Sequence, residues 1–258
     1  MDPADSGSPY TSPTVRILGP IQIDGPGSPP RGRVAEVTEA IVYLALHPNG
    51  VDVDELVLAL WRRTDVAAET WRGVVSRARC WLRGHGSTDD DFLLVRGGHV
   101  TLGETVQLDW RRFDALTACA YRSGQDGIGD LRDALSLVRG PPLFGRPANR
   151  YAWLVDTFFE YEIPAAIDDA ANRLATLCLQ AGDWAGARDA ARRGLLVDRD
   201  SERLLRAWLQ AECALGNQAQ ARIVCGLLQR DPANLDPDTT ALLDNLPIRL
   251  RRTVSHTH

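Results

Sequence analysis

The residues best suited to binding chemistry lie in one predicted helix, which begins near Asp65 or Thr70 and ends at Arg83. At about 100° per residue, one side of this helix carries polar side chains within about 60° of one another. These side chains are Arg72, Ser76, Arg79 and Arg83, with Arg77 flanking them. No acidic residue occurs from position 70 to position 88. A guanidinium fork can pair with phosphate oxygens or with the O6 and N7 edge of guanine, so the spacing predicts a DNA-binding face.

A simpler interpretation of the same helix face stays open. A basic face is often only solvated, or it is paired with nearby acids such as Asp52, Asp54 and Glu69. The two interpretations differ in one structural respect. Arginines that bind DNA should not already form salt bridges with carboxylates of the same chain.

The basic residues of the chain are all arginines: Lys+Arg is 29, and no lysine occurs in 258 residues. This excludes chemistry that needs an ε-amine, such as a Schiff base, a phosphate-binding-loop lysine or a kinase lysine. The same bias is typical of a GC-rich genome. The net charge is −5, and residues 15–112 hold 12 arginines against 13 carboxylates, so nucleic-acid binding would require a local basic patch.

No set of residues predicts an enzyme, a cofactor site or a metal site. The serines lack a G-x-S-x-G setting, and Gly124, Gly127 and Gly129 do not form a dinucleotide-binding fingerprint. The five cysteines include no C-x-x-C pair, which indicates free thiols in a reducing cytosol. The run from Asp89 to Asp91 is expected to be a solvated turn.

Membrane and export signals are also lacking in the sequence. The longest apolar run, Ile41 to Leu46, is too short to span a bilayer. The first 14 residues are rich in Ser, Pro, Gly and Asp, which is typical of a flexible linker rather than a signal peptide. We therefore expect a cytoplasmic segment without membrane contact.

The pattern of the first part of the chain predicts a winged helix. Two short alternating runs, 15–19 and 21–25, predict strands, and 34–47 predicts a helix. Asp52 and Glu55 have the spacing of a capping box at the start of a second helix. After the arginine-bearing third helix, β-rich runs at 92–95 and 99–102 flank Gly97-Gly98, which predicts a hairpin. Arg96 and His99 would lie at this wing, where such folds contact phosphate or the minor groove.

The second part of the chain is predicted to be almost wholly helical. The segment from Gly182 to Arg188 recurs from Gly216 to Arg222 at an offset of 34 residues, the tetratricopeptide (TPR) period. The stretch 151–181 contains Pro164, which predicts two helices or one kinked helix. Its aromatic residues are expected in the core. We thus predict a mainly α protein with a linker at 1–14, a winged helix-turn-helix domain at 15–112, a TPR-like domain at 113–247 and a tail at 248–258.

Several motifs, taken in order, resemble the SARP-type transcriptional regulators of actinobacteria. The segments that carry the resemblance are 15–23, 43–48, 54–56, 59–61, 75–79 and 132–143. The last is similar to the start of the bacterial transcriptional activator domain, a TPR-like bundle. The resemblance covers roughly residues 15–247, and its motifs are individually loose.

The resemblance implies a winged helix that binds direct repeats in promoters and a helical domain that contacts RNA polymerase or a second copy. It would place Arg72, Ser76, Arg77, Arg79 and Arg83 against DNA, and Arg96 and His99 in the wing. The chain departs from the family pattern at Glu36 and Glu39, which follow Arg31 and Arg33, and in its short wing with a single arginine.

Residues 109–110 and 150–153 look closest to a subgroup in which this module is the cytoplasmic end of a membrane-anchored protein, often with a LysM-like domain. The alternative function is therefore a protein-interaction module whose winged helix no longer binds DNA.

Overall fold

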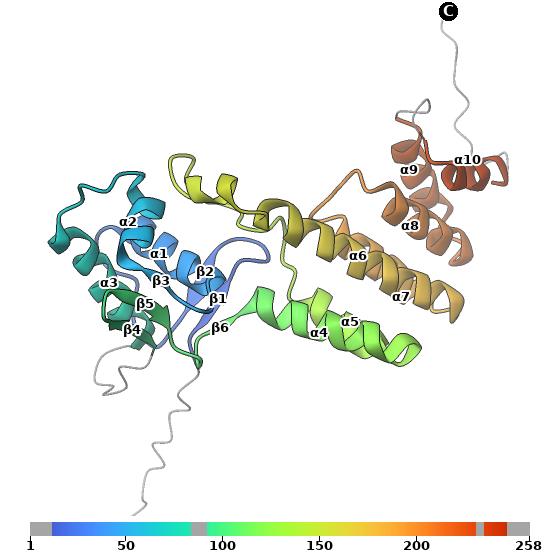
Figure 1. Ribbon diagram of the computed structural model, residues 1–258. Helices are drawn as coiled ribbons and strands as arrows, with labels where there is room; N and C mark the ends of the chain where they lie inside the picture. Colours follow the sequence, from blue (N-terminus) through green and yellow to red (C-terminus); the bar gives the residue numbers. More distant parts are fainter. Residues whose placement is uncertain (1–11, 84–91, 231–234, 247–258) are drawn as a thin grey trace, which may run out of the picture. The chain divides into compact units, whose positions relative to one another are not determined.

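A computed structural model describes residues 12–83, 92–230 and 235–246 (Figure 1). The chain divides into two compact units. The winged unit comprises Met1–Arg112 and Leu143–Glu160, and the repeat unit comprises Phe113–Pro142 and Tyr161–His258. Most of the predicted linker, all of the predicted tail and the run from Asp89 to Asp91 lie outside the described residues.

The segment Leu143–Glu160, which we call the strap, differs from its sequence-based assignment to the second domain, because it packs with the winged unit. The backbone N–H of Leu143 donates to the Ile17 carbonyl at 2.8 Å, and that of Phe144 donates to the Gly19 carbonyl at 3.0 Å. These long-range bonds fix the start of the strap beside the first strand. No local pattern in the sequence encodes such pairing.

Two small sheets frame the winged unit. In the first, β1 (Thr14–Arg16) pairs antiparallel with β2 (Gln22–Asp24) and parallel with β6 (Gln107–Leu108). In the second, β5 (His99–Leu102) lies between β3 (Val51–Asp52) and β4 (Leu93–Arg96), antiparallel to both. Gly97 and Gly98 join β4 to β5 with φ of 58° and 85°. A two-residue type I′ turn needs positive φ at both positions, so the predicted hairpin is present.

Three helices fill the space around these sheets, namely α1 (Val34–Leu46), α2 (Val53–Trp61) and α3 (Ala68–Arg83). Nearly every residue of α1 from Val37 to Leu46 is buried. This helix contacts α2, α3, β1 and β5, so it is the central element of the core. The predicted mainly helical fold class, with a winged helix followed by a helical bundle, is confirmed.

The predicted capping box at the start of α2 is wrong. Asp52 is the residue before the helix, but its side chain caps no backbone N–H. Its carboxylate instead lies 3.1 Å from Nδ1 of His99, and that of Glu55 accepts a hydrogen bond from the Tyr43 hydroxyl at 2.9 Å. Long-range partners have therefore replaced the local bonds that the motif predicts. The N–H of Val53 donates to the Gly98 carbonyl of the wing at 2.8 Å.

The repeat unit is built from helices. Most of α4 (Asp109–Ser123) lies in it, followed by the 3-10 helix η1 (Gly124–Gly127) and α5 (Ile128–Ser136). After the strap come α6 (Phe159–Gln180), α7 (Trp184–Gly194), α8 (Glu202–Ala214), α9 (Gln218–Leu228) and α10 (Pro237–Asp244). Pro164 lies inside α6, which is one continuous helix. Leucines of α8, α9 and α10 share one apolar core.

The two sequence repeats form the same turn between paired helices. Gly182 and Gly216 have φ of 74° and 75°, a left-handed conformation that glycine adopts without strain. The next residue in each turn, Asp183 or Asn217, donates its N–H to a carbonyl five residues earlier, at 2.8 and 3.0 Å. Ala187 and Ala221, which follow, are fully buried. Small residues at these positions let the helices pack closely.

The aromatic residues around the strap do not all lie in the core, contrary to the prediction. Tyr151 and Trp153 are buried, and the Trp153 ring packs edge-on against Tyr43 of α1 with centroids 4.9 Å apart. Phe158 and Tyr161 are 82% and 76% exposed. They lie where the chain leaves the 3-10 helix η2 (Ala152–Asp156) and enters α6.

Candidate nucleic-acid interface

The third helix is amphipathic, as its periodicity requires. Val74, Val75, Ala78, Trp81 and Leu82 are buried against the rest of the winged unit. On the other side, Arg72, Ser76 and Arg77 are exposed, whereas Arg79 and Arg83 are half-buried. The predicted polar face therefore points away from the core, and its most accessible arginines, Arg72 and Arg77, precede the last turn of the helix.

The exposed arginines have their described contacts within α3 itself. The Arg72 guanidinium lies over the Trp71 ring, 5.4 Å from its centroid. Nη1 of Arg77 donates to the Gly73 carbonyl at 2.8 Å. In the part of the chain that the structure describes, neither residue forms a salt bridge with a carboxylate. Within these ranges, no carboxylate forms a salt bridge with the two charges that could meet an external anion.

Arg79 has a structural contact that the sequence pattern did not predict. Its Nε donates to the Leu93 carbonyl of β4 at 3.1 Å. This bond ties the middle of α3 to the first strand of the wing. Arg79 thus fixes the position of the wing relative to the helix.

The two predicted wing residues face each other across the hairpin but have different surroundings. Arg96 and His99 are partners in the β4–β5 register, and Arg96 is exposed. Both ring nitrogens of His99 are engaged, with Nε2 at 2.9 Å from the Asn49 carbonyl and Nδ1 at 3.1 Å from Oδ1 of Asp52. These two hydrogen bonds, in that order of importance, raise the pKa of His99 above its ordinary value of 6.5. His99 therefore fastens the wing to the turn before α2.

A glycine loop contacts the last turns of α3, which sequence reasoning missed. The N–H of Gly27 donates to the Trp81 carbonyl at 3.0 Å. A Cβ atom on Gly27 would lie 2.4 Å from the carbonyl oxygens of both Cys80 and Trp81. Only glycine permits this approach. Two glycines close in sequence, Gly25 and Gly27, were the only sign of this close approach, and the segment was interpreted as an ordinary turn.

Asp109 is a second residue with a role that the sequence did not reveal. Its buried carboxylate accepts hydrogen bonds from the backbone N–H groups of Ile17, at 2.8 and 3.0 Å, and of Leu18, at 3.0 Å. Charged acceptors make such bonds stronger than neutral ones. Asp109 thereby holds the end of β1 to the start of α4.

The acidic residues of the first helix form salt bridges with one arginine of the strap. Glu36 and Glu39 lie 2.8 and 2.9 Å from the two terminal guanidinium nitrogens of Arg150. Burial raises the pKa of the Glu39 carboxyl above 4.5, while hydrogen bonds from Arg150 and the Tyr151 N–H oppose that rise. The two carboxylates that argued against DNA binding are therefore already paired.

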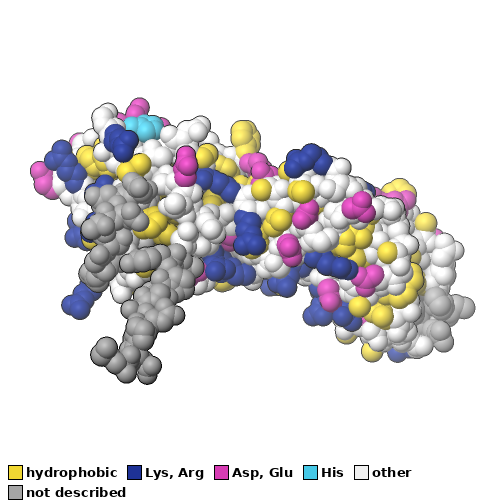
Figure 2. All heavy atoms as spheres, turned by 90° about the horizontal axis from the view of Figure 1, so that it is seen from below, with side chains coloured by type: hydrophobic (Ala, Val, Ile, Leu, Met, Phe, Trp, Pro, Cys, Tyr) yellow, Lys and Arg dark blue, Asp and Glu magenta, His cyan; other side chains and the backbone are white. Residues whose placement is uncertain are grey.

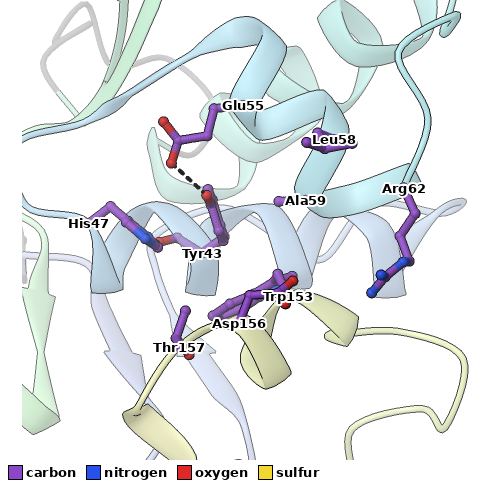
Figure 3. A pocket seen from close by; sticks show the side chains of 9 residues that line it. All are labelled: Tyr43, His47, Glu55, Leu58, Ala59, Arg62, Trp153, Asp156 and Thr157. Atoms are coloured by element: carbon purple, nitrogen blue, oxygen red, sulfur yellow. Dashed lines mark hydrogen bonds between the residues drawn. The ribbon is translucent and has the colours of Figure 1, made fainter.

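A cavity of about 390 Å³ lies between α1, α2 and η2 of the winged unit (Figure 3). Glu55 and Tyr43 meet in it through their hydrogen bond, and Arg62 reaches in from the end of α2. The remaining lining residues are His47, Leu58, Ala59, Trp153, Asp156 and Thr157. Its charges are of both signs, and no nucleophile with an adjacent base is present among these side chains.

The rest of the described surface offers no metal site and no membrane-spanning element. The described residues contain no group of three or more His, Cys, Asp or Glu side chains that could hold a metal ion. No helix in the described ranges is long and apolar enough to cross a lipid bilayer. On the face drawn in Figure 2, dark blue arginine and magenta carboxylate side chains lie interspersed.

Comparison with known proteins gives a match at the level of structure. No protein-family model matches the sequence, and no curated protein matches it. A solved structure of Mycobacterium tuberculosis EmbR in complex with a low affinity phosphopeptide matches 90% of this chain with a TM-score of 0.60. The chain is similar in fold to EmbR.

The sequence identity to EmbR is 20%, a level at which the likeness shows the fold alone. The match covers 64% of the EmbR chain, so this chain spans less than two thirds of that protein. The shared fold agrees with the winged helix and helical second domain that the sequence patterns predicted.

Proposed function

We propose that this chain is a module of a transcriptional regulator and not an enzyme. Its winged unit binds promoter DNA in the cytoplasm through α3 and the wing, and its repeat unit contacts proteins, such as a second copy or RNA polymerase. The observation that carries the proposal is the outward face of α3, where Arg72 and Arg77 are exposed and unpaired with carboxylates of the described residues. The EmbR-like fold supports it.

The seven predicted site residues fall into two groups, those that would contact DNA and those that would position neighbouring elements. Arg72, Ser76 and Arg77 are exposed and would contact phosphates or base edges when α3 enters the major groove. Arg96 would reach the backbone from the tip of the wing. Arg79 and His99 would act as positioning residues, because each one bonds a neighbouring element of the winged unit. Arg83 would contact DNA at the end of the helix.

The solved EmbR structure is a complex with a low affinity phosphopeptide. That complex supports protein ligands for this fold in general. Since this chain spans only 64% of EmbR, we assign no phosphopeptide site to it.

A binding assay on genomic DNA fragments over a salt series tests the proposal. We expect binding at low salt, with weaker binding by Arg72→Gln and by Arg77→Gln. Each lost phosphate contact should reduce the slope of log Kobs against log salt by about 0.9. Arg173→Gln, which removes an exposed arginine of α6 in the repeat unit, is the matched control and should bind like the wild type.

Failure of the folded protein to bind any fragment at low salt would overturn the proposal. The alternative function, a protein-interaction module that does not bind DNA, would then remain. It was motivated by the near-neutral winged domain and by the acidic first helix, whose Glu36 and Glu39 share the single positive charge of Arg150.

A further inference from the structure

In the repeat unit, an ion pair between Arg132 and Asp183 joins two neighbouring helices, and the next repeat can be compared with it. In α5 the sequence from Leu131 to Leu135 reads L-R-D-A-L, and α7 has A-R-D-A-A from Ala187 to Ala191. Nη2 of Arg132 lies 2.6 Å from Oδ2 of Asp183, the residue before α7. The other oxygen of Asp183 accepts the Gly186 N–H at 2.9 Å. A carboxylate thus joins the arginine of α5 to the start of α7.

The same position in the next repeat lacks the carboxylate. Asn217 occupies the place of Asp183, 34 residues later, and Arg188 occupies the place of Arg132. The Asn217 side chain caps no N–H of α9 and donates instead to Oε2 of Glu212 at 2.7 Å. Arg188 and Asn217 line a hollow of about 450 Å³ between α7, α8 and α9. Within the described residues, Arg188 forms its salt bridge with its chain neighbour Asp189 at 2.9 Å.

A second arginine and a tryptophan complete this hollow. The Arg192 guanidinium lies over the Trp208 ring, 5.8 Å from its centroid. Glu212 also lines the hollow but is only 2% exposed. Its two oxygens accept hydrogen bonds from Nε1 of Trp208, at 2.8 Å, and from Asn217. Glu212 therefore orients the tryptophan and the asparagine, and no described salt bridge joins it to either arginine.

The hollow continues along α7. A neighbouring hollow of about 300 Å³ shares Arg192 and is lined further by Asp189, Arg193 and Leu196. We call the two together the α7 groove. A groove that extends along a helix suits an elongated ligand better than a compact one. Its three arginines at 188, 192 and 193 favour an anionic ligand.

We propose that the α7 groove binds an acidic peptide segment of a partner protein. One Asp or Glu carboxylate of that segment takes the place against Arg188 that Asp183 takes against Arg132. Arg192 contacts a second carboxylate while Trp208 packs against the peptide chain. This inference deepens the proposed function, because it rests on the repeat unit being the part that contacts proteins.

Fluorescence anisotropy with the full chain tests the groove. The probe is a labelled ten-residue peptide of Glu and Asp with Gly spacers, and the matched probe replaces each acid by Gln or Asn. We expect binding of the acidic probe only, weakened about tenfold by Arg188→Gln and by Arg192→Gln. Arg173→Gln, outside the groove, should bind the probe like the wild type.

The variant Asn217→Asp is the sharpest test, because it restores the carboxylate of the first repeat. The new carboxylate can no longer donate to the buried Glu212 carboxylate and is repelled by it, so it should turn toward Arg188 and displace the peptide. Affinity should then fall about tenfold, and the melting temperature should decrease because the bond to Glu212 is lost. Equal binding of the neutral probe, or unchanged affinity of Asn217→Asp, would overturn the proposal.

DNA binding by the same variants separates the two proposals. Asn217→Asp should bind DNA like the wild type, because its change lies in the repeat unit. A chain that binds the acidic probe but no DNA would support the groove and overturn the DNA-binding function. A chain that binds DNA but not the acidic probe would support the DNA-binding function and overturn the groove proposal.

Discussion

Arg150 of the strap and Glu39 of α1 form a buried ion pair, with Nη1 of the guanidinium 2.9 Å from Oε2 of the carboxylate. The two side chains are 17% and 1% exposed. The Tyr151 N–H donates to the other oxygen of Glu39 at 2.6 Å, and Glu36 binds the second terminal nitrogen of Arg150. One arginine of the strap thus forms salt bridges with two carboxylates of the central helix.

Replacing Arg150 by Met should lower the free energy of unfolding by about 3 kcal/mol, since it leaves Glu39 buried without a counterion. Urea unfolding would measure the change. Arg16→Met is a suitable control, because Arg16 and Asp24 pair at the surface with side chains 41% and 36% exposed. Its cost should stay below about 1 kcal/mol. Equal costs for the two variants would show that the strap pair has no special role.

The free energy of unfolding should depend on pH in part through the titration of Glu39. Burial raises its pKa above 4.5 in the folded state, so the folded chain binds this proton more tightly than the unfolded chain. The contribution of Glu39 to stability is then greatest below pH 4.5 and decreases as pH rises through the folded-state pKa. Unfolding free energies of the wild type and Glu39→Gln, compared over pH, should show their difference falling in this window. A difference that increases with pH would mean that the pairing with Arg150 outweighs burial.

His99 should titrate above 6.5, because its ring donates to the Asn49 carbonyl and to Asp52 when it is protonated. The stabilisation that it provides is complete below pH 6.5 and is lost as pH rises through the raised pKa. An NMR titration of the imidazole signals would measure this pKa directly. Asp52→Asn should lower it, whereas Asp54→Asn, two residues later in the first turn of α2, should leave it almost unchanged. A pKa at or below 6.5 in the wild type would contradict the contacts seen for the wing.

Gly27→Ala should destabilise the winged unit by about 1–3 kcal/mol, because its methyl group would collide with two backbone carbonyls of α3. The collision shifts the end of α3, so the affinity for DNA should also fall. Thermal unfolding and the DNA assay would measure both effects. Gly32→Ala, at a position with open space around it, is the matched control and should change neither.

Elements governed by local signals were predictable from the sequence. The Gly97-Gly98 hairpin, the amphipathic α3 and the repeated turn at Gly182 and Gly216 follow from turn chemistry and periodicity. These features depend on residues that are near one another in the chain. The order of the helices and strands could therefore be predicted from the sequence.

The predictions that differed from the structure involve partners that are distant in the chain. Asp52 and Glu55 have the spacing of a capping box, yet they bind His99 and Tyr43. Arg79 remains a predicted DNA-binding residue, but its spacing gave no sign of the bond from its Nε to the Leu93 carbonyl of β4. The role of Arg150 could not be seen at all, because it lies more than a hundred positions from Glu39. Spacing identifies the face of a helix on which a side chain lies, whereas its partner depends on the tertiary fold.

The strap makes the winged unit discontinuous in the sequence, since the chain leaves it at Arg112 and returns at Leu143. A gene fragment that stops at residue 112 would encode all of α3 and the wing but would omit Arg150, Tyr151 and Trp153. We therefore expect that residues 12–112 alone do not form a complete winged unit. A chimaera that exchanges this unit would need to carry the strap together with the helices that it contacts.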